Sequence, residues 1–454
     1  MILKKSETSI NAENNLHWPH SEQDKLKKGK EIHDLIAKLY PICRSITGNG
    51  VRKTLEIIKE IIPIDIHEVP SGTEVYDWTV PKEWNIRDAW IKNSSGEKIV
   101  DFKKTNLQVL NYSVPIHEKR NLAELKIKLF TLKEHPSLIP YLTTYYKEDW
   151  GFCITHDQFR ELKEDTYEVF IDSELKEGSL TYGELFIKGE REEEFLLSSY
   201  ICHPSLCNDN LSGPALLVYV AKAILELKSL GVKQRYSYRF LFIPETIGAI
   251  TWLSRNEQRA GRIKHGLIAT CTGDSGISTY KKSRQGNSEI DKAAEKILQE
   301  SGEEYKIVEF FPSGSDERQF CSPGFNLPVG SLMRTMYGCF PEYHTSADDL
   351  EFVKPEFLGD TFTKYLKIIF VIENNTKYLS TNLKCEPRLG KRGLYSSIGS
   401  QKSQALNELA VLWTMNMSDG KNSLLDIAIR SDLPFEQIKN AANALEKHSL
   451  LKEI

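Results

Sequence analysis

The sequence predicts an α/β protein in which a β-sheet is covered by helices on both faces. From residue 166 onward, apolar strand-like segments alternate with helix-like segments, which is typical of such a sheet. Several of the strand-like segments end in polar residues, and open α/β sheets place their functional sites at such strand ends. The chain has 454 residues, too many for one ordinary core, so two or three domains are expected.

Two changes of pattern divide the first 375 residues. Residues 23–62 carry apolar side chains at helical spacing and predict two helices joined by a loop. Residues 67–130 change to short β-rich segments separated by Pro, Gly and Asn turns, which indicates a small inserted β-domain. The main α/β domain is therefore expected to comprise 20–66 and 131–375.

The C-terminal part predicts a separate small domain. Residues 376–402 are rich in Ser, Asn, Gly and basic residues and indicate a linker, and 403–454 predict three short helices. The break at Ser431–Pro434 resembles a helix-turn-helix. This domain holds five Lys and Arg against seven Asp and Glu, and its charge argues against DNA binding, which depends on neutralising phosphates. We expect it to serve protein contacts or dimerisation.

Composition narrows the function classes. The net charge of −4 gives no electrostatic basis for binding nucleic acid or an anionic membrane. No apolar run approaches the roughly 18–20 residues of a spanning helix, and the first 20 residues lack the apolar stretch of a signal peptide. We therefore expect a cytoplasmic protein. None of the eight cysteines forms a CxxC pair, so neither disulfides nor a structural zinc knot are expected.

The segment SSYICHPSLCNDNLSG is the most informative for chemistry. A strand delivers His203 into a turn, and Asp209 follows six residues later, before a hydrophobic helix. An imidazole and a carboxylate at a strand end are suitable ligands for zinc. Two further polar residues, Asp274 in CTGDSG and His344 in YHTSADD, follow apolar strands or lie in loops, although each alone is compatible with an ordinary turn.

Glu245 follows the apolar strand in FLFIPETIG. A carboxylate at the end of a buried strand is costly unless it has a partner. Burial raises its pKa, which suits a general base that takes a proton from an activated water. The alternative is a carboxylate that only caps the following helix.

The order of these residues resembles that of the zinc aminopeptidases with co-catalytic metals. The resemblance rests on His203, Asp209 within NDNLSG, Glu245, Asp274, and His344 within YHTSAD. It implies a mixed sheet, His203 and Asp274 on one metal, His344 on the other, Asp209 as the bridge, and Glu245 as the base. Thr246 stands where that family has a second ligating Glu. We therefore expect one zinc held by His203, Asp209 and His344, with two as the alternative and Asp274 as a ligand or an orienting group.

Over almost its whole length the chain resembles a bacterial family of aminopeptidase-like proteins with a C-terminal winged helix. The motifs that carry this resemblance are YPICRSITGNGVR, VYDWTVPKEWNI, ICHPSLCNDNLSG, PETIG and YHTSADDLEFV. It implies a link to polysaccharide biosynthesis and leaves the substrate open. Arg44 and Tyr343 are candidate substrate-binding residues, and Asp316 in SGSDERQF resembles a residue of a substrate-side loop.

Three functions remain in competition. The first is a zinc-dependent hydrolase of the aminopeptidase type that cleaves an amide or peptide bond of a small substrate. The second is a catalytically degenerate protein that binds an amide or sugar ligand, because Thr246 replaces a ligand. The third is a ligand-sensing regulator that uses the winged helix. The combination of Glu245 with both histidines favours the hydrolase.

Overall fold

The computed structural model describes residues 19, 21–394 and 402–454, so most of the first 20 residues and part of the predicted linker lie outside it. The chain divides into two compact units. The first, the sheet unit, runs up to Gly286 and resumes over Glu304–Tyr365. The second, the C-terminal unit, comprises Asn287–Glu303 and Leu366–Ile454.

The two predicted opening helices are present. Helix α1 (Glu22–Leu39) begins at Ser21, whose hydroxyl oxygen accepts the amide N–H of Asp24 at 3.1 Å, and this bond satisfies one free donor of the first turn. Its apolar side chains recur at helical spacing and are buried. At Gly29 a Cβ atom would lie 1.7 Å from the carbonyl oxygen of Pro355, so the glycine permits the close approach of that segment. Helix α2 (Asn49–Lys59) follows after a loop.

An eight-stranded mixed sheet forms the centre of the sheet unit, in the order β1-β10-β12-β11-β13-β16-β14-β15. Strands β12, β11, β13 and β16 are parallel neighbours, whereas β1, β10 and β14 introduce antiparallel pairs. All residues of β11 and β12 are buried, as expected for strands covered on both faces. The strands are β1 (Asp65–Pro70), β10 (Ser179–Ile187), β11 (Glu194–Tyr200), β12 (Ser237–Ile243), β13 (Ile263–Ala269), β14 (Ser278–Lys281), β15 (Tyr305–Val308) and β16 (Val329–Met333).

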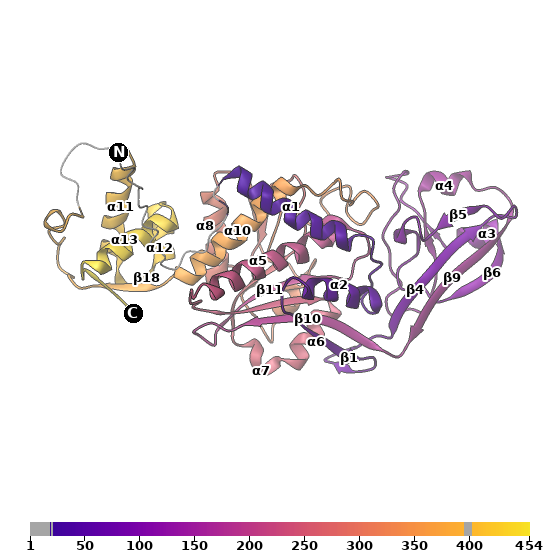
Figure 1. The fold of residues 1–454 in the computed structure, drawn as a ribbon, viewed down its shortest axis with the longest axis horizontal. Helices are drawn as coiled ribbons and strands as arrows, with labels where there is room; N and C mark the ends of the chain where they lie inside the picture. The colour runs from indigo at the N-terminus through magenta and orange to yellow at the C-terminus, as the bar shows by residue number, and fades with distance from the viewer. Residues whose placement is uncertain (1–18, 20, 395–401) are drawn as a thin grey trace, which may run out of the picture. The chain divides into compact units, whose positions relative to one another are not determined.

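Helices cover both faces of this sheet. Helices α1, α2 and α5 (Ser212–Ser229) lie on one face, and α6 (Ile247–Arg255) and α7 (Glu257–Ala260) lie on the other (Figure 1). The stretch Cys207–Ser229 has the length and apolar composition of a membrane-spanning helix, but 72% of it is buried inside the protein. It is therefore a core helix, and its apolar side chains are interrupted by charged residues.

The inserted β-domain is larger than the sequence predicts. Its four-stranded sheet has the order β5-β4-β9-β6 and a core of its own. The segments TYEVFIDSEL and SLTYGELFIKG, which correspond to β9 and β10, have the sequence pattern of a hairpin. Strand β9 instead pairs with β4 and β6, so the insertion extends to about residue 176. The elements of the insertion and its flanks are β2 (Glu74–Val75), β3 (Trp78–Thr79), β4 (Glu83–Lys92), β5 (Lys98–Asp101), β6 (Ile116–Asn121), α3 (Leu122–Lys126), β7 (Leu129–Phe130), β8 (Phe152–Cys153), α4 (His156–Glu161) and β9 (Thr166–Lys176).

The C-terminal unit contains the three predicted helices, α11 (Lys402–Met417), α12 (Leu424–Ser431) and α13 (Phe435–Lys447). They accompany a three-stranded sheet of β18 (Asp419–Ser423), β17 (Lys377–Ser380) and β19 (Leu451–Glu453). Strand β17 lies inside the segment that was predicted to be a linker, so the domain begins before residue 403. Helix α8 (Glu289–Glu300) belongs to the same unit, and Glu300 accepts the amide of Phe435 at 2.8 Å.

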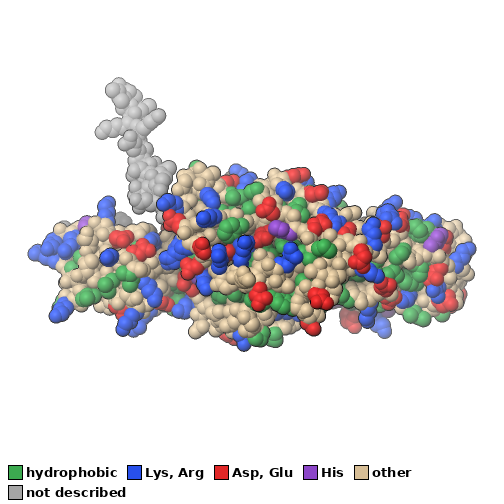
Figure 2. All heavy atoms as spheres, turned by 90° about the horizontal axis from the view of Figure 1, so that it is seen from below, with side chains coloured by type: hydrophobic (Ala, Val, Ile, Leu, Met, Phe, Trp, Pro, Cys, Tyr) green, Lys and Arg blue, Asp and Glu red, His purple; other side chains and the backbone are tan. Residues whose placement is uncertain are grey.

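One short helix and one long helix complete the sheet unit. Helix α9 spans Glu317–Phe320, and α10 spans Pro355–Asn374 and continues into the C-terminal unit. On the face that Figure 2 draws, basic and acidic side chains are interspersed. That face therefore presents no extended field of one sign, in agreement with the small net charge.

Candidate metal centre

The carboxyl ends of β11 and β12 bring two of the predicted site residues together. The strands are parallel neighbours whose register ends with Tyr200 opposite Ile243. His203 follows three residues after the end of β11, and Glu245 follows two residues after the end of β12. His203 Nε2 lies 3.9 Å from Glu245 Oε2. The register of a parallel sheet therefore explains why residues 42 positions apart meet at one edge.

A tight turn before α5 holds Asp209. The buried Asp348 carboxylate accepts the backbone amides of Cys207 at 3.1 Å, Asn208 at 2.5 Å and Asp209 at 2.8 Å. Gly213 lies close to the ends of two strands, where a Cβ atom would be 2.3 Å from the Ala269 carbonyl oxygen. The turn is thus fixed by a distant carboxylate and by a glycine that permits close packing.

His203, Asp209 and His344 converge on one point. Asp209 Oδ2 lies 2.9 Å from His344 Nε2 and 4.0 Å from His203 Nε2. The two imidazole centroids are 5.3 Å apart. The ligand atoms of the three residues all lie within 4.8 Å of one another. His344 has a φ of +54°, a strained conformation for a residue with a side chain, and such strain is often found at functional sites.

These three residues fit a zinc ion by their chemistry and by their convergence. Asp209 Oδ2 and His344 Nε2 are both buried and face each other at 2.9 Å. This separation is close to that of two atoms bound to one zinc ion at about 2 Å each. Two imidazole nitrogens and one carboxylate oxygen form a donor set that catalytic zinc uses, with a further position left open for water.

The surroundings of His203 and Asp209 keep both side chains in the protonation states that bind a cation. Burial is the main cause that lowers the pKa of His203 to about 4, and the nearby His344 and Arg44 act in the same direction. The imidazole is therefore neutral at neutral pH, the form that binds metal. Burial alone would raise the pKa of Asp209, but the two histidines and the Tyr200 hydroxyl hold this pKa below its usual value. Asp209 is thus a carboxylate.

Glu245 has the properties of a base that remains accessible. Its side chain is 27% exposed, in contrast to the fully buried Asp209. Burial in the protein raises the pKa of Glu245 well above its ordinary value, and the negative charges of Asp316 and Asp209 raise it further. Its backbone amide donates to Cys202 Sγ at 3.3 Å. A raised pKa favours acceptance of a proton.

Asp274 does not join the three converging ligands. Its carboxylate accepts hydrogen bonds from the side-chain amide of Asn208 at 3.0 Å and from the amide of Gly276 at 2.8 Å. The amide and hydroxyl of Thr335 donate to the same carboxylate. Asp274 thus holds the side chain of Asn208, the neighbour of Asp209, and its two predicted roles, metal ligand and orienting group, stay predictions.

Two predicted substrate contacts require correction. Arg44 and Asp316 are both completely buried, so no substrate can reach them in this structure. Arg44 Nε donates to the carbonyl oxygen of His203 at 2.8 Å and supports the backbone of that residue. Asp316 accepts the amide of Thr246 at 2.7 Å and so holds the residue after Glu245. Both are positioning residues, a role that a loop sequence does not reveal.

Tyr343, a predicted substrate contact, lies beside the cluster of His203, Asp209 and His344. Its ring stacks on His344 with centroids 4.0 Å apart and an interplanar angle of 11°, and it is partly exposed. Tyr343 therefore remains a candidate for substrate contact.

The sequence analysis missed three residues that build the site. Asp348 fixes the Asp209 turn by accepting its backbone amide. The Tyr200 hydroxyl donates to Asp209 Oδ1. The Tyr141 ring lies 5.0 Å from the His203 ring and 5.1 Å from the His344 ring. Only Asp348 had a signal, because it follows His344 in the same HTSAD motif.

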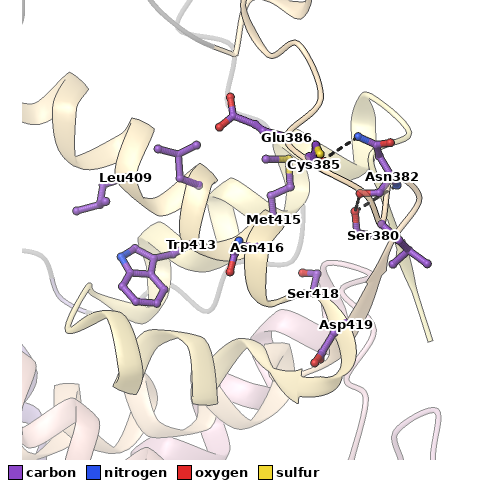
Figure 3. Close-up of a pocket in the computed structure, with 12 residues that line it drawn as sticks. Ser380, Asn382, Cys385, Glu386, Leu409, Trp413, Met415, Asn416, Ser418 and Asp419 are labelled. Atoms are coloured by element: carbon purple, nitrogen blue, oxygen red, sulfur yellow. Dashed lines mark hydrogen bonds between the residues drawn. The ribbon is translucent and has the colours of Figure 1, made fainter.

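A different kind of cavity lies in the C-terminal unit, between α11 and the segment after β17 (Figure 3). Its volume is about 640 Å³. Apolar side chains line much of it, namely Leu383, Leu409, Leu412, Trp413 and Met415. The two groups of metal-ligand residues found among the described parts of the chain both lie in the sheet unit. The chemistry therefore belongs to the sheet unit.

Comparison with known proteins agrees with this division. Residues 33–375 match the model of a family described as a domain of unknown function, DUF4910. The chain belongs to this family. Residues 376–453 match a winged helix-turn-helix model, which includes strand β17. A relative in Clostridium acetobutylicum is 59% identical over 430 residues, which is 95% of this chain and 98% of the relative. It is described as a candidate polysaccharide biosynthesis protein with an aminopeptidase-like domain.

Solved structures share the fold of this DUF4910 member. A candidate peptidase from Clostridium acetobutylicum is 57% identical, with a TM-score of 0.90 over 95% of this chain and 98% of that chain. A zinc aminopeptidase from Bacillus subtilis has a TM-score of 0.55 at 12% identity, over 76% of this chain and 95% of that chain. An M28 peptidase precursor from Shewanella amazonensis has a TM-score of 0.54 at 14% identity, over 81% and 97%. The sheet unit thus has the aminopeptidase-like fold predicted from the sequence.

Proposed function

We propose that this protein is a zinc-dependent hydrolase that cleaves an amide or peptide bond in a small substrate. The observation that carries the proposal is the convergence of His203, Asp209 and His344, whose ligand atoms all lie within 4.8 Å of one another in a buried site. The aminopeptidase-like fold supports the same reaction class.

Each residue at the cluster has a distinct task in this reaction. His203, Asp209 and His344 would hold the ion, which supplies positive charge that polarises a carbonyl and lowers the pKa of a water. Glu245 accepts the proton of that water and returns it to the leaving nitrogen. Asp348 and Asp274 hold the turn that carries Asp209, and Arg44 supports the backbone of His203. Tyr343 lies beside His344, where it can contact the substrate.

We propose one zinc ion in the resting enzyme. Thr246 provides no carboxylate at the position after Glu245, and Asp274 uses its oxygens in hydrogen bonds. A second group of ligand atoms, from Cys202, His203 and Glu245, is less suitable. Burial raises the pKa of the Cys202 thiol well above its ordinary value, and zinc binds the thiolate.

Three further observations support the proposed substrate class, the cellular compartment and the role of the winged helix. The Clostridium acetobutylicum relative is described as a candidate polysaccharide biosynthesis protein, which favours as substrate an amide on a sugar or polysaccharide precursor over a peptide. The eight cysteines are all free, which supports a reducing compartment such as the cytoplasm. The winged helix is proposed to make protein contacts, and a salt-sensitive shift of duplex DNA by the full chain would instead support a regulator.

Metal analysis coupled to hydrolysis tests the proposed function. We expect about one zinc per chain in the purified protein, and strong loss of metal in His203→Ala and in His344→Ala. Hydrolysis is measured on amino-acid amides, dipeptides and N-acetylated amino sugars. His265→Ala is the matched control, because this buried histidine lies at β13 away from the cluster. Equal metal content in all four proteins would exclude the site, and bound zinc without hydrolysis would favour a degenerate binding protein.

A further inference from the structure

Two aromatic rings stand exposed side by side on the sheet unit. Trp78 lies in the short hairpin β2–β3 and is 41% exposed, and Tyr146 is 50% exposed. Their rings meet edge to face with centroids 5.5 Å apart. Exposed aromatic rings in contact are unusual, because each buries a large apolar area when it can. We refer to Trp78 and Tyr146 as the aromatic pair.

The chain segment that carries Tyr146 also contacts the metal cluster. The segment that ends in Tyr146 pairs with the loop of His344, since the amide of Tyr141 donates to the carbonyl oxygen of His344 at 2.7 Å. The Tyr141 ring lies about equally near both metal-binding imidazoles. Its hydroxyl meets that of Tyr145 at 3.1 Å, and Tyr146 is the next residue. One segment therefore orders a metal ligand and presents an exposed ring.

The backbone on both sides of the pair is strained. Tyr146 has a φ of +63°, and Tyr76, in the turn of the β2–β3 hairpin, has a φ of +56°. A residue with a side chain pays of order 1–3 kcal/mol in this region, where glycine would be free of strain. Tyr76 also anchors the hairpin, because its hydroxyl donates to Glu257 Oε2 at 3.2 Å. The hairpin that carries Trp78 is thus held in place.

The surroundings of the aromatic pair favour a small ring with hydroxyl groups as its occupant. Asp77 precedes Trp78 and is exposed, and the exposed ion pair of Glu148 with Lys82 at 2.7 Å lies two residues after Tyr146. These groups can accept from or donate to hydroxyl groups of a ligand. A pyranose ring has an apolar face of C–H groups that packs on an aromatic face, and its rim carries hydroxyls. A protein partner would need about 800 Å² of surface, far more than two half-exposed rings supply.

We propose that the aromatic pair of Trp78 and Tyr146 is a subsite that binds a sugar ring of the substrate whose amide lies at the metal cluster. This inference rests on the proposed function, because it names the substrate class for the same site. It predicts that the preferred substrate is an N-acylated amino sugar within a short saccharide, with one ring at the cluster and the next at the aromatic pair.

Binding of a saccharide to the full chain tests this inference without any need for hydrolysis. The probe is the β-1,4-linked tetramer of N-acetylglucosamine, added to protein freed of metal by chelation. Saturation-transfer NMR is expected to show transfer of magnetisation from the protein to the sugar-ring protons of the tetramer. Isothermal titration calorimetry measures the affinity of the tetramer for the protein. Trp78→Ala and Tyr146→Ala are each expected to weaken binding at least tenfold. Trp78→Phe, which keeps an apolar ring, is expected to lose less.

A matched tryptophan supplies the control. Trp90 stacks on Phe170 in the four-stranded sheet, with ring centroids 5.0 Å apart, and Trp90→Ala is expected to bind the tetramer as the parent does. Thermal melting of each variant checks folding. The inference is overturned if the tetramer does not bind, if Trp78→Ala binds it equally well, or if the dipeptide Phe-Phe competes fully for the same site. Absence of zinc in the parent with intact, Trp78-dependent saccharide binding would instead reject the proposed function alone.

Discussion

Strands β11 and β12 serve two buried polar clusters of opposite character. Near their amino ends, Arg239 donates to Glu194 through Nε at 2.6 Å and Nη2 at 2.8 Å, and its Nη1 donates to Glu184. Every nitrogen of this buried guanidinium has a carboxylate partner. Beyond their carboxyl ends, the cluster of His203, Asp209 and His344 keeps ligand atoms without hydrogen-bond partners.

The difference between these clusters separates stability from function. A buried charge that is paired and hydrogen-bonded is part of the folded framework, and it is expensive to disrupt. A group of imidazole and carboxylate ligand atoms that converge on one point can instead be completed by a cation from outside the chain. The same sheet thus supplies a closed cluster at one end and an open cluster at the other, and mutations at the two ends should have different effects.

The largest expected effect lies at the open cluster. We expect Glu245→Gln to reduce kcat by about 10²- to 10⁴-fold, because glutamine cannot accept a proton. Zinc content should be unchanged, since the proposed ligands are His203, Asp209 and His344 and the alternative group with Cys202 and Glu245 is less suitable. The hydrolysis rate on the substrate that the parent cleaves tests the fall in kcat, and metal analysis tests the zinc content. Glu192→Gln, at a side chain that is 81% exposed, is the control and should retain activity; equal rates in the two variants would remove Glu245 as the base.

The closed cluster should respond in stability alone. We expect Arg239→Met to lower the free energy of unfolding by about 3–5 kcal/mol, because it leaves Glu194 buried without its partner. Urea unfolding followed by circular dichroism measures this change. The folded fraction should still bind zinc in the normal ratio. A variant that unfolds normally but loses zinc would contradict the division between the two clusters.

Much of the sheet and of the open cluster could be predicted from the sequence. Strands β11 and β12 are buried on both faces, so their apolar runs are continuous and the polar residues that follow them stand out. This is why His203 and Glu245 were found. The pairing of β9 was predicted incorrectly, because only two residues separate β9 from β10 and such spacing is typical of a hairpin. Pairing with β4 depends on tertiary contacts in the insertion.

The positioning residues were harder to predict for a physical reason. Asp348 accepts amides that lie about 140 residues earlier in the chain, and no local pattern encodes such a contact. Arg44 was predicted to contact the substrate, but it is buried against the carbonyl of His203. Local sequence patterns thus identified the candidate metal ligands and base. The residues that position them could be identified only from the three-dimensional structure.

The support of the Asp209 turn gives a prediction of intermediate size. We expect Asp348→Asn to weaken zinc binding by about 10- to 100-fold, because one carbonyl oxygen cannot accept the three amides that the carboxylate accepts. Competition with a chelating dye measures the affinity. Asp349→Asn is the matched control, since Asp349 accepts the amides of Glu351 and Phe352. Equal affinities in the two variants would show that the turn does not depend on Asp348.

The smallest expected effect concerns a second hydrogen-bonded ion pair, Arg52 with Glu83, and tests whether it too contributes to the free energy of unfolding. Arg52 of α2 donates to both oxygens of Glu83 of β4, at 2.7 Å and 2.6 Å. These bonds are the main cause that lowers the pKa of Glu83 to about 2 from an ordinary value of 4.5. Between these pH values the unfolded state binds more protons than the folded state, so the free energy of unfolding falls as pH falls.

We therefore expect Glu83→Gln to cost about 1 kcal/mol at pH 6, a modest value because solvent screens a pair in which Arg52 is partly exposed. The cost should shrink towards zero as the pH approaches 2, where the parent also loses the carboxylate. Urea midpoints of parent and variant at pH 6, 4 and 3 give the comparison. A difference that stays constant over this range would mean that the charge of Glu83 contributes nothing, and that only its shape matters to the contact between α2 and β4.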